Sequence, residues 1–183
     1  MSLFLLITCI TEITGWIIKG HHHPNQWIYN IYLIFEAGFN SLMFGNLLQK
    51  YIRATLPVLI GSCLILLCYV IEVFSHGFFI FNDITATVMS VIFVFYSFLY
   101  YYLLIRDDRY IDLKHDESFW WVAGTLFFYF GSTACNLFYV YLKDVLVNQH
   151  NITYIIFAAL SVLLYGCWSY SFICRKWLTT LKT

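Results

Sequence analysis

The chain alternates between long apolar segments and short polar connections. Six apolar segments cover residues 2–18, 27–48, 56–81, 84–105, 119–142 and 153–174. Each has about the length that an α-helix needs to cross a hydrocarbon core of roughly 30 Å. The pattern predicts an all-α fold: an integral membrane six-helix bundle that forms a single transmembrane domain over residues 1–183.

Composition supports a membrane protein rather than a water-soluble one. Charged residues make up 11% of the chain and the mean hydropathy is +0.75, whereas soluble domains carry about 25% charged residues. The formal net charge is zero and the basic residues flank the apolar segments, so nucleic acid is not an expected partner. The expected surroundings are the lipid bilayer.

The basic residues predict how the chain is threaded. Lys19 and Lys143 fall on one side of the membrane. The other side holds Lys50, Arg53, Arg106, Arg109, Lys114, Arg175, Lys176 and Lys182. Because Lys and Arg are retained in cytoplasmic loops, both termini are expected to be cytoplasmic. The first segment has no charged region before it, so a removable signal peptide is not expected.

One short pattern occurs twice. Ala37-Gly38 followed by Phe44-Gly45 recurs as Ala123-Gly124 followed by Phe130-Gly131, in the second and fifth segments. A three-plus-three inverted repeat, an architecture common among transporters, would produce this arrangement. The alternative is that small residues recur wherever helices pack closely.

Three carboxylates stand out within the apolar segments. Counted from the segment ends, Glu12, Glu36 and Glu72 lie about 12–14 Å below the outer surface by helix rise, and no Lys or Arg occurs at that depth. A charge near the bilayer centre costs roughly 2.5 kcal/mol or more. Either these groups hold protons, or a cation or cationic ligand supplies the missing charge. The alternative is a glutamic acid hydrogen-bonded to a neighbouring Tyr, Thr or Asn.

These carboxylates define a candidate ligand- or proton-binding site that opens toward the outer side. Its expected members are Glu12, Glu36, Glu72, Asn40, Tyr32 and Asn136.

Other chemistry is not indicated. His76, His21 and His23 are candidate metal ligands on the outer side, but their spacing matches no metal signature, and separate loop histidines are the alternative. The six cysteines include no CxxC pair. No phosphate-binding loop or nucleophile motif is present. We therefore expect a non-enzymatic protein with no cofactor and no metal.

Two segments carry a family resemblance. Residues 10–16 (ITEITGW) and 30–36 (NIYLIFE) resemble those of uncharacterised small polytopic membrane proteins of Bacteroidota, and Phe119-Trp120 with Phe128-Tyr129-Phe130-Gly131 is similar too. The resemblance implies no activity and no functional residues. It is consistent with an integral protein of the bacterial inner (cytoplasmic) membrane.

The leading interpretation is small-solute or proton- or cation-linked transport, including channel-like conduction, through a carboxylate-lined polar core. The alternative is a membrane sensor or accessory subunit that acts through a partner protein, as in a signalling or immunity operon. Another membrane protein or a second copy of the chain is the expected partner.

Overall fold

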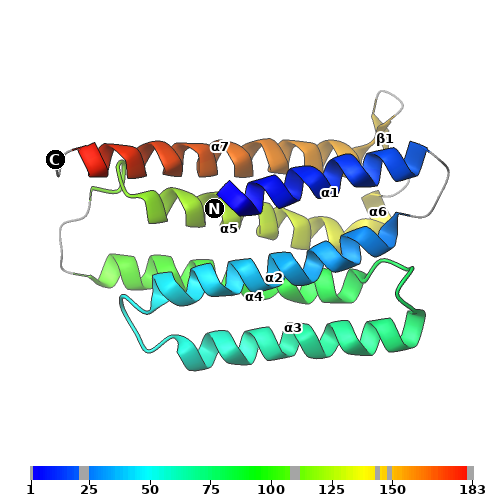
Figure 1. Cartoon of the computed structure of the whole chain (residues 1–183), viewed down its shortest axis with the longest axis horizontal. Coiled ribbons are helices and arrows are strands. Elements are labelled where there is room, and N and C mark those ends of the chain that lie inside the picture. Colours follow the sequence, from blue (N-terminus) through cyan, green and yellow to red (C-terminus); the bar gives the residue numbers. More distant parts are fainter. Residues whose placement is uncertain (1, 21–24, 108–111, 143–144, 148–149, 181–183) are drawn as a thin grey trace. The chain divides into compact units, whose positions relative to one another are not determined.

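The structure, a computed structural model, describes residues 2–20, 25–107, 112–142, 145–147 and 150–180. Within these residues the chain forms six long helices, one four-residue helix and a hairpin of two-residue strands (Figure 1). The elements are α1 (Ser2–Gly20), α2 (Gln26–Leu48), α3 (Thr55–His76), α4 (Asp83–Arg106), α5 (Glu117–Leu137), α6 (Tyr139–Leu142), β1 (Leu146–Val147), β2 (His150–Asn151) and α7 (Ile152–Thr180). The prediction of an all-α chain with six long helices is confirmed.

Four of the described helices are long and apolar enough to cross a membrane. They are α2, α3, α4 and the Ile152–Cys174 part of α7. In α1, Phe4–Gly15 forms a shorter apolar helix. These apolar helices indicate a multi-pass membrane protein.

Three helix ends differ from those predicted, one of them being the end of α7, which was expected at residue 174 and lies at Thr180. The third segment was expected to run to residue 81, but α3 ends at His76. Gly77 follows with φ +84°, a conformation that suits glycine and breaks the helix. The fifth segment was expected to run to residue 142, but α5 ends at Leu137 and a separate short helix, α6, begins at Tyr139.

The chain divides into two compact units, residues 1–89 and 90–183, with the boundary inside α4. In unit 1, α2 contacts both α1 and α3. The ring of Phe4 on α1 stacks on Phe35 and Phe39 of α2, with ring centroids 5.7 and 4.2 Å apart. Aromatic packing of this kind holds the first two helices side by side.

In unit 2 the closest pair of helices is α5 and α7. Trp121 and Trp168 stack with ring centroids 6.0 Å apart. The indole N–H of Trp168 donates to the Trp121 carbonyl at 3.2 Å, and the Ser171 hydroxyl donates to the Glu117 carbonyl at 2.7 Å. Buried side chains therefore satisfy carbonyls near the start of α5 from the neighbouring helix.

Small residues allow the close approach of α5 and α7. A Cβ added at Gly124 would lie 2.8 Å from the Cys167 Cβ and 3.2 Å from the Leu164 carbonyl oxygen. One added at Gly131 would meet the end of the Leu160 side chain. The expectation that both glycines lie at helix contacts is confirmed.

The two matching glycines in α2 behave differently. At Gly45 an added Cβ would lie 3.8 Å from Val58, an ordinary van der Waals contact. At Gly38 nothing lies within 4 Å of an added Cβ, so the expectation of close packing is wrong there. The two copies of the repeated pattern thus have different packing roles.

Candidate binding groove

Glu72 caps the first turn of α4. One of its carboxylate oxygens accepts from the Ile84 N–H at 2.9 Å. The other accepts from the Thr85 N–H at 2.8 Å and from the Thr85 hydroxyl at 2.7 Å. The side chain is 6% exposed. The first N–H groups of a helix lack partners within the helix and carry partial positive charge. A buried carboxylate is therefore stabilised here without any Lys or Arg.

Asn30 holds the loop between α3 and α4. Its amide nitrogen donates to the carbonyls of Phe78 (2.8 Å) and Ile80 (2.7 Å). Its amide oxygen accepts from the Asn82 N–H at 3.1 Å. The side chain is fully buried on α2. One asparagine thus ties α2 to the α3–α4 connection and satisfies loop backbone groups that have no helical partners.

Polar residues also join α1 to α2. The hydroxyls of Thr8 and Tyr32 are 2.9 Å apart, and the hydroxyl of Tyr29 hydrogen-bonds the Glu12 side chain. These two contacts pair position 8 with 32 and position 12 with 29, which fixes the antiparallel register of the helices. Tyr32, a predicted site residue, therefore serves at least as a contact between helices.

The register separates two of the predicted carboxylates. Glu12 is at the level of Tyr29, and Glu36 is seven residues further along α2, a distance of about 10 Å at 1.5 Å per residue. Counting from the segment ends had suggested one depth for both. Glu72 interacts instead with α4. Glu12 and Glu36 thus lie at different levels of the α1–α2 pair, and Glu72 lies at the start of α4; a single site formed by all three stays a prediction.

The remaining predicted site residues are scattered. Asn40 is fully buried in α2, while Asn136 is exposed near the end of α5 in unit 2. His76 is exposed at the last position of α3. His21 and His23 lie outside the described residues. Among the residues that are described, no three His, Cys, Asp or Glu side chains form a group that could hold a metal.

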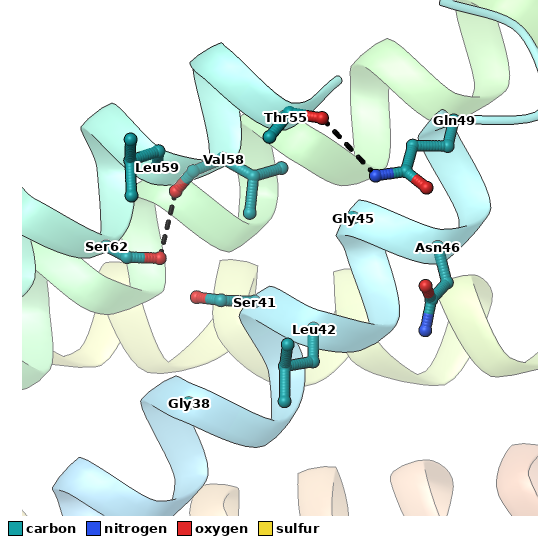
Figure 2. A pocket seen from close by; sticks show the side chains of 10 residues that line it. All are labelled: Gly38, Ser41, Leu42, Gly45, Asn46, Gln49, Thr55, Val58, Leu59 and Ser62. Carbon is teal, nitrogen blue, oxygen red and sulfur yellow. Dashed lines mark hydrogen bonds between the residues drawn. The ribbon is translucent and has the colours of Figure 1, made fainter. Parts of the chain in front are cut away.

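A groove lies between the C-terminal half of α2 and the first turns of α3 (Figure 2), with a volume of about 370 Å³. This volume is near the lower end of the roughly 300–1,000 Å³ typical of ligand pockets. Its lining residues are Gly38, Ser41, Leu42, Gly45, Asn46, Gln49, Thr55, Val58, Leu59 and Ser62. None of these ten residues is charged.

The groove combines apolar walls with a few hydrogen-bonding groups. Ser41 is 6% exposed, and its side chain points into the groove toward α3 (Figure 2). At the end next to the α2–α3 connection, the Gln49 amide donates to the Thr55 hydroxyl at 3.4 Å. The Ser62 hydroxyl donates to the Val58 carbonyl within α3 at 2.9 Å. Apolar walls with a few placed polar groups are typical of small-molecule sites.

Sequence reasoning did not find this groove. It treated Gly38 and Gly45 as packing positions only. A signal was nevertheless present: Gly38, Ser41 and Gly45 are small and lie on one face of α2 at helical spacing. What the sequence does not show is that α3 leaves this face partly uncovered.

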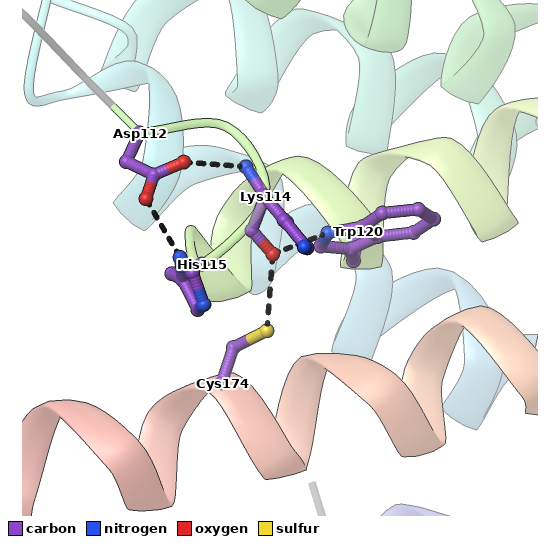
Figure 3. A network of polar contacts seen from close by, with 5 residues as sticks. All are labelled: Asp112, Lys114, His115, Trp120 and Cys174. Atoms are coloured by element: carbon purple, nitrogen blue, oxygen red, sulfur yellow. Dashed lines mark hydrogen bonds and ion pairs between the residues drawn. The ribbon is translucent and has the colours of Figure 1, made fainter.

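A second polar cluster lies in the described part of the α4–α5 connection, in unit 2 (Figure 3). Asp112 accepts from the Lys114 N–H at 3.1 Å and lies 2.6 Å from the His115 Nδ1. The Lys114 carbonyl in turn accepts from the Trp120 indole at 3.1 Å and from the Cys174 thiol at 3.6 Å. The cluster anchors this loop to α5 and α7.

Comparison of the chain with protein-family models, with curated proteins and with solved structures finds no match.

Proposed function

We propose that this is a non-enzymatic membrane protein that acts by binding, as a sensor or accessory subunit working through a partner. The observation that carries the proposal is the 370 Å³ groove between α2 and α3. The best-placed buried polar groups elsewhere in unit 1 are used to hold helices and loops: Glu72 caps α4 and Asn30 holds the α3–α4 loop. The groove, by contrast, offers open space and polar groups inside one helix pair.

The lining of the groove favours a particular class of ligand. Leu42, Val58 and Leu59 would bind an apolar body, and the hydroxyl of Ser41 would accept or donate one hydrogen bond. With no charged lining residue, the part of the ligand inside the groove would be uncharged, because burying an unpaired charge is costly. An amphipathic molecule that enters from the bilayer fits this description.

Filling the groove tests the proposal. Gly38→Leu would place a side chain where an added Cβ meets nothing within 4 Å, so the fold is expected to survive. We expect total lipid extract from the host membrane to raise the unfolding temperature of delipidated wild-type protein in detergent. The rise is expected to be clearly smaller for Gly38→Leu.

Gly166→Leu is the matched control. Gly166 is also in a helix, α7, and an added Cβ there meets nothing within 4 Å either. This variant is expected to keep the full temperature rise. An equal rise for Gly38→Leu and wild type would contradict a ligand site in the groove.

Transport remains a second candidate because of Glu12. Its side chain is exposed along α1 and interacts with Tyr29 rather than with the backbone N–H groups of a helix N-terminus, so it would be available to take up a proton or cation. Proton flux into vesicles containing purified protein, followed with a pH-sensitive dye, would separate the two functions. Transport predicts a flux that falls in Glu12→Gln and Glu36→Gln, whereas a binding protein gives no flux above that of empty vesicles.

A further inference from the structure

Two positive charges lie in the connection next to one end of the groove. The connection between α2 and α3 runs from Gln49, which caps α2, to Ala54, which precedes α3. Gln49 and Thr55 line the groove on either side of this connection (Figure 2). Lys50 and Arg53 are both exposed within it. A molecule that occupies the groove and extends beyond this end would therefore pass the segment that carries the two cations.

No carboxylate balances these charges nearby in the sequence. Between Glu36 and Glu72 the only charged residues are Lys50 and Arg53. Within the described part of the chain, neither is recorded in an ion pair. The α4–α5 connection is different, because Arg106 and Lys114 lie among Asp107, Asp112, Asp116 and Glu117. The α2–α3 connection thus carries two positive charges with no acidic residue close to them in the sequence.

The size and lining of the groove indicate which other part the ligand would have. Its volume of about 370 Å³ is too small for a whole phospholipid but large enough for part of one acyl chain. The chain would lie against Leu42, Val58 and Leu59, which line the groove. Gln49, next to Lys50 in the chain, is placed to meet the more polar region where the acyl chain joins its headgroup.

We propose that the groove binds an anionic phospholipid of the leaflet that faces Lys50 and Arg53, with an acyl chain in the groove and the phosphate between the two cations. This inference rests on the proposed function, because it names the ligand of the same groove. Arg binds phosphate through two parallel N–H groups and Lys through a point charge. Basic pockets between membrane helices are known to take anionic headgroups.

The test compares two lipids that differ in headgroup charge. Phosphatidylglycerol and phosphatidylcholine with identical acyl chains are titrated onto delipidated protein in detergent, and binding is followed by native mass spectrometry. At about a factor of five for each basic residue, two cations predict roughly 30-fold tighter binding of phosphatidylglycerol. The double variant Lys50→Gln/Arg53→Gln is expected to bind both lipids with similar affinity.

The controls separate a specific site from general surface charge. Arg106→Gln/Lys114→Gln removes the same number of charges from unit 2 and is expected to retain the preference for phosphatidylglycerol. If it loses the preference to the same extent, the site at Lys50 and Arg53 is overturned. Inorganic phosphate is expected not to displace the lipid; displacement at millimolar concentration would show a simple anion site and overturn the role of the acyl chain.

The same binding measurements separate failure of the anionic-lipid proposal from failure of the proposed function. Equal affinity of wild-type protein for the two lipids would overturn the choice of an anionic headgroup, while weaker binding of both lipids to Gly38→Leu would still support the groove as a ligand site. If Gly38→Leu binds both lipids as wild type does, the groove is not the site and both proposals fail.

Discussion

At the scale of single residues, Glu72 shows how a carboxylate is accommodated in an apolar helix. Its oxygens accept two backbone N–H groups and one hydroxyl. Hydrogen bonds to charged groups each contribute about 1.5–3 kcal/mol. Glu72→Gln removes the negative charge. It also replaces one accepting oxygen by an amide N–H₂, which cannot accept a hydrogen bond from these donors. We expect it to lower the free energy of unfolding by about 1.5–3 kcal/mol, and Glu72→Ala to lower it further.

Equilibrium unfolding in mild detergent measures this difference. Ser75→Ala in the same helix is a suitable control, because Ser75 is exposed and substitutions at such positions usually change stability by about 0.5 kcal/mol or less. Equal stability of Glu72→Gln and wild type would show that the cap does not stabilise the α3–α4 pair.

A second prediction concerns the pKa of Asp112. The hydrogen bond with the His115 side chain is the main cause that lowers the pKa of this exposed carboxyl. A carboxyl with a lowered pKa in the folded state adds stability above its unfolded pKa and loses it as the pH falls through its folded pKa. His115→Ala is expected to raise the pKa of Asp112 toward its usual value. Carbon NMR of the carboxyl measures it, with His76→Ala as control; an unchanged pKa would refute the assignment.

Glu72 and Asn30 show which features of single residues could be predicted from the sequence and which could not. Glu72 was selected because no Lys or Arg occurs at its depth, yet the groups that stabilise it are backbone N–H groups of α4. Every residue except proline carries such a group, so the sequence does not show which backbone N–H groups will stabilise a carboxylate. Asn30, which holds a whole loop, was overlooked because a single asparagine in an apolar segment resembles many others.

At the scale of helices, three glycines give a graded test of packing. Gly124→Ala would bring its Cβ to 2.8 Å from the Cys167 Cβ and close to a backbone carbonyl, which cannot move easily. Overpacking of this kind typically costs about 1–3 kcal/mol. Gly131→Ala meets only the flexible end of Leu160 and should cost less. Gly38→Ala meets nothing and should gain about 0.5–1 kcal/mol from helix propensity.

The order of unfolding temperatures should therefore be Gly38→Ala, then Gly131→Ala, then Gly124→Ala, from highest to lowest. A Gly124→Ala variant as stable as Gly38→Ala would contradict the close approach of α5 and α7.

Helix positions were easier to predict than helix ends. Apolar length located all six long helices, because a helix that crosses a bilayer must be long and apolar. The end of α3 was missed because residues 78–81 are also apolar, and hydropathy does not register the positive φ of Gly77. The groove was missed for a related reason: it depends on how far apart two helices stand, which a single helix does not reveal.

At the scale of the whole molecule, the basic residues make a prediction about threading. Cytoplasmic retention of Lys and Arg predicts that Lys50, Arg109 and the C-terminus all face the cytoplasm. Fusions of a reporter active only in the cytoplasm at each of these points should all be active. Activity of a periplasmic reporter at any one of them would contradict the threading.

The cap formed by Glu72 has a consequence for how the protein is made. Its donors belong to the next helix, so α3 emerging alone must bring an uncompensated carboxylate into the bilayer, at a cost of roughly 2.5 kcal/mol or more. When α4 follows, Ile84 and Thr85 supply the missing donors. The two helices are thus expected to enter the membrane together as a hairpin. In that case α3 would stay at the insertion machinery until α4 has been synthesised. In a cell-free insertion assay, α3 alone should insert less completely than the α3–α4 pair, and Glu72→Leu should abolish that difference.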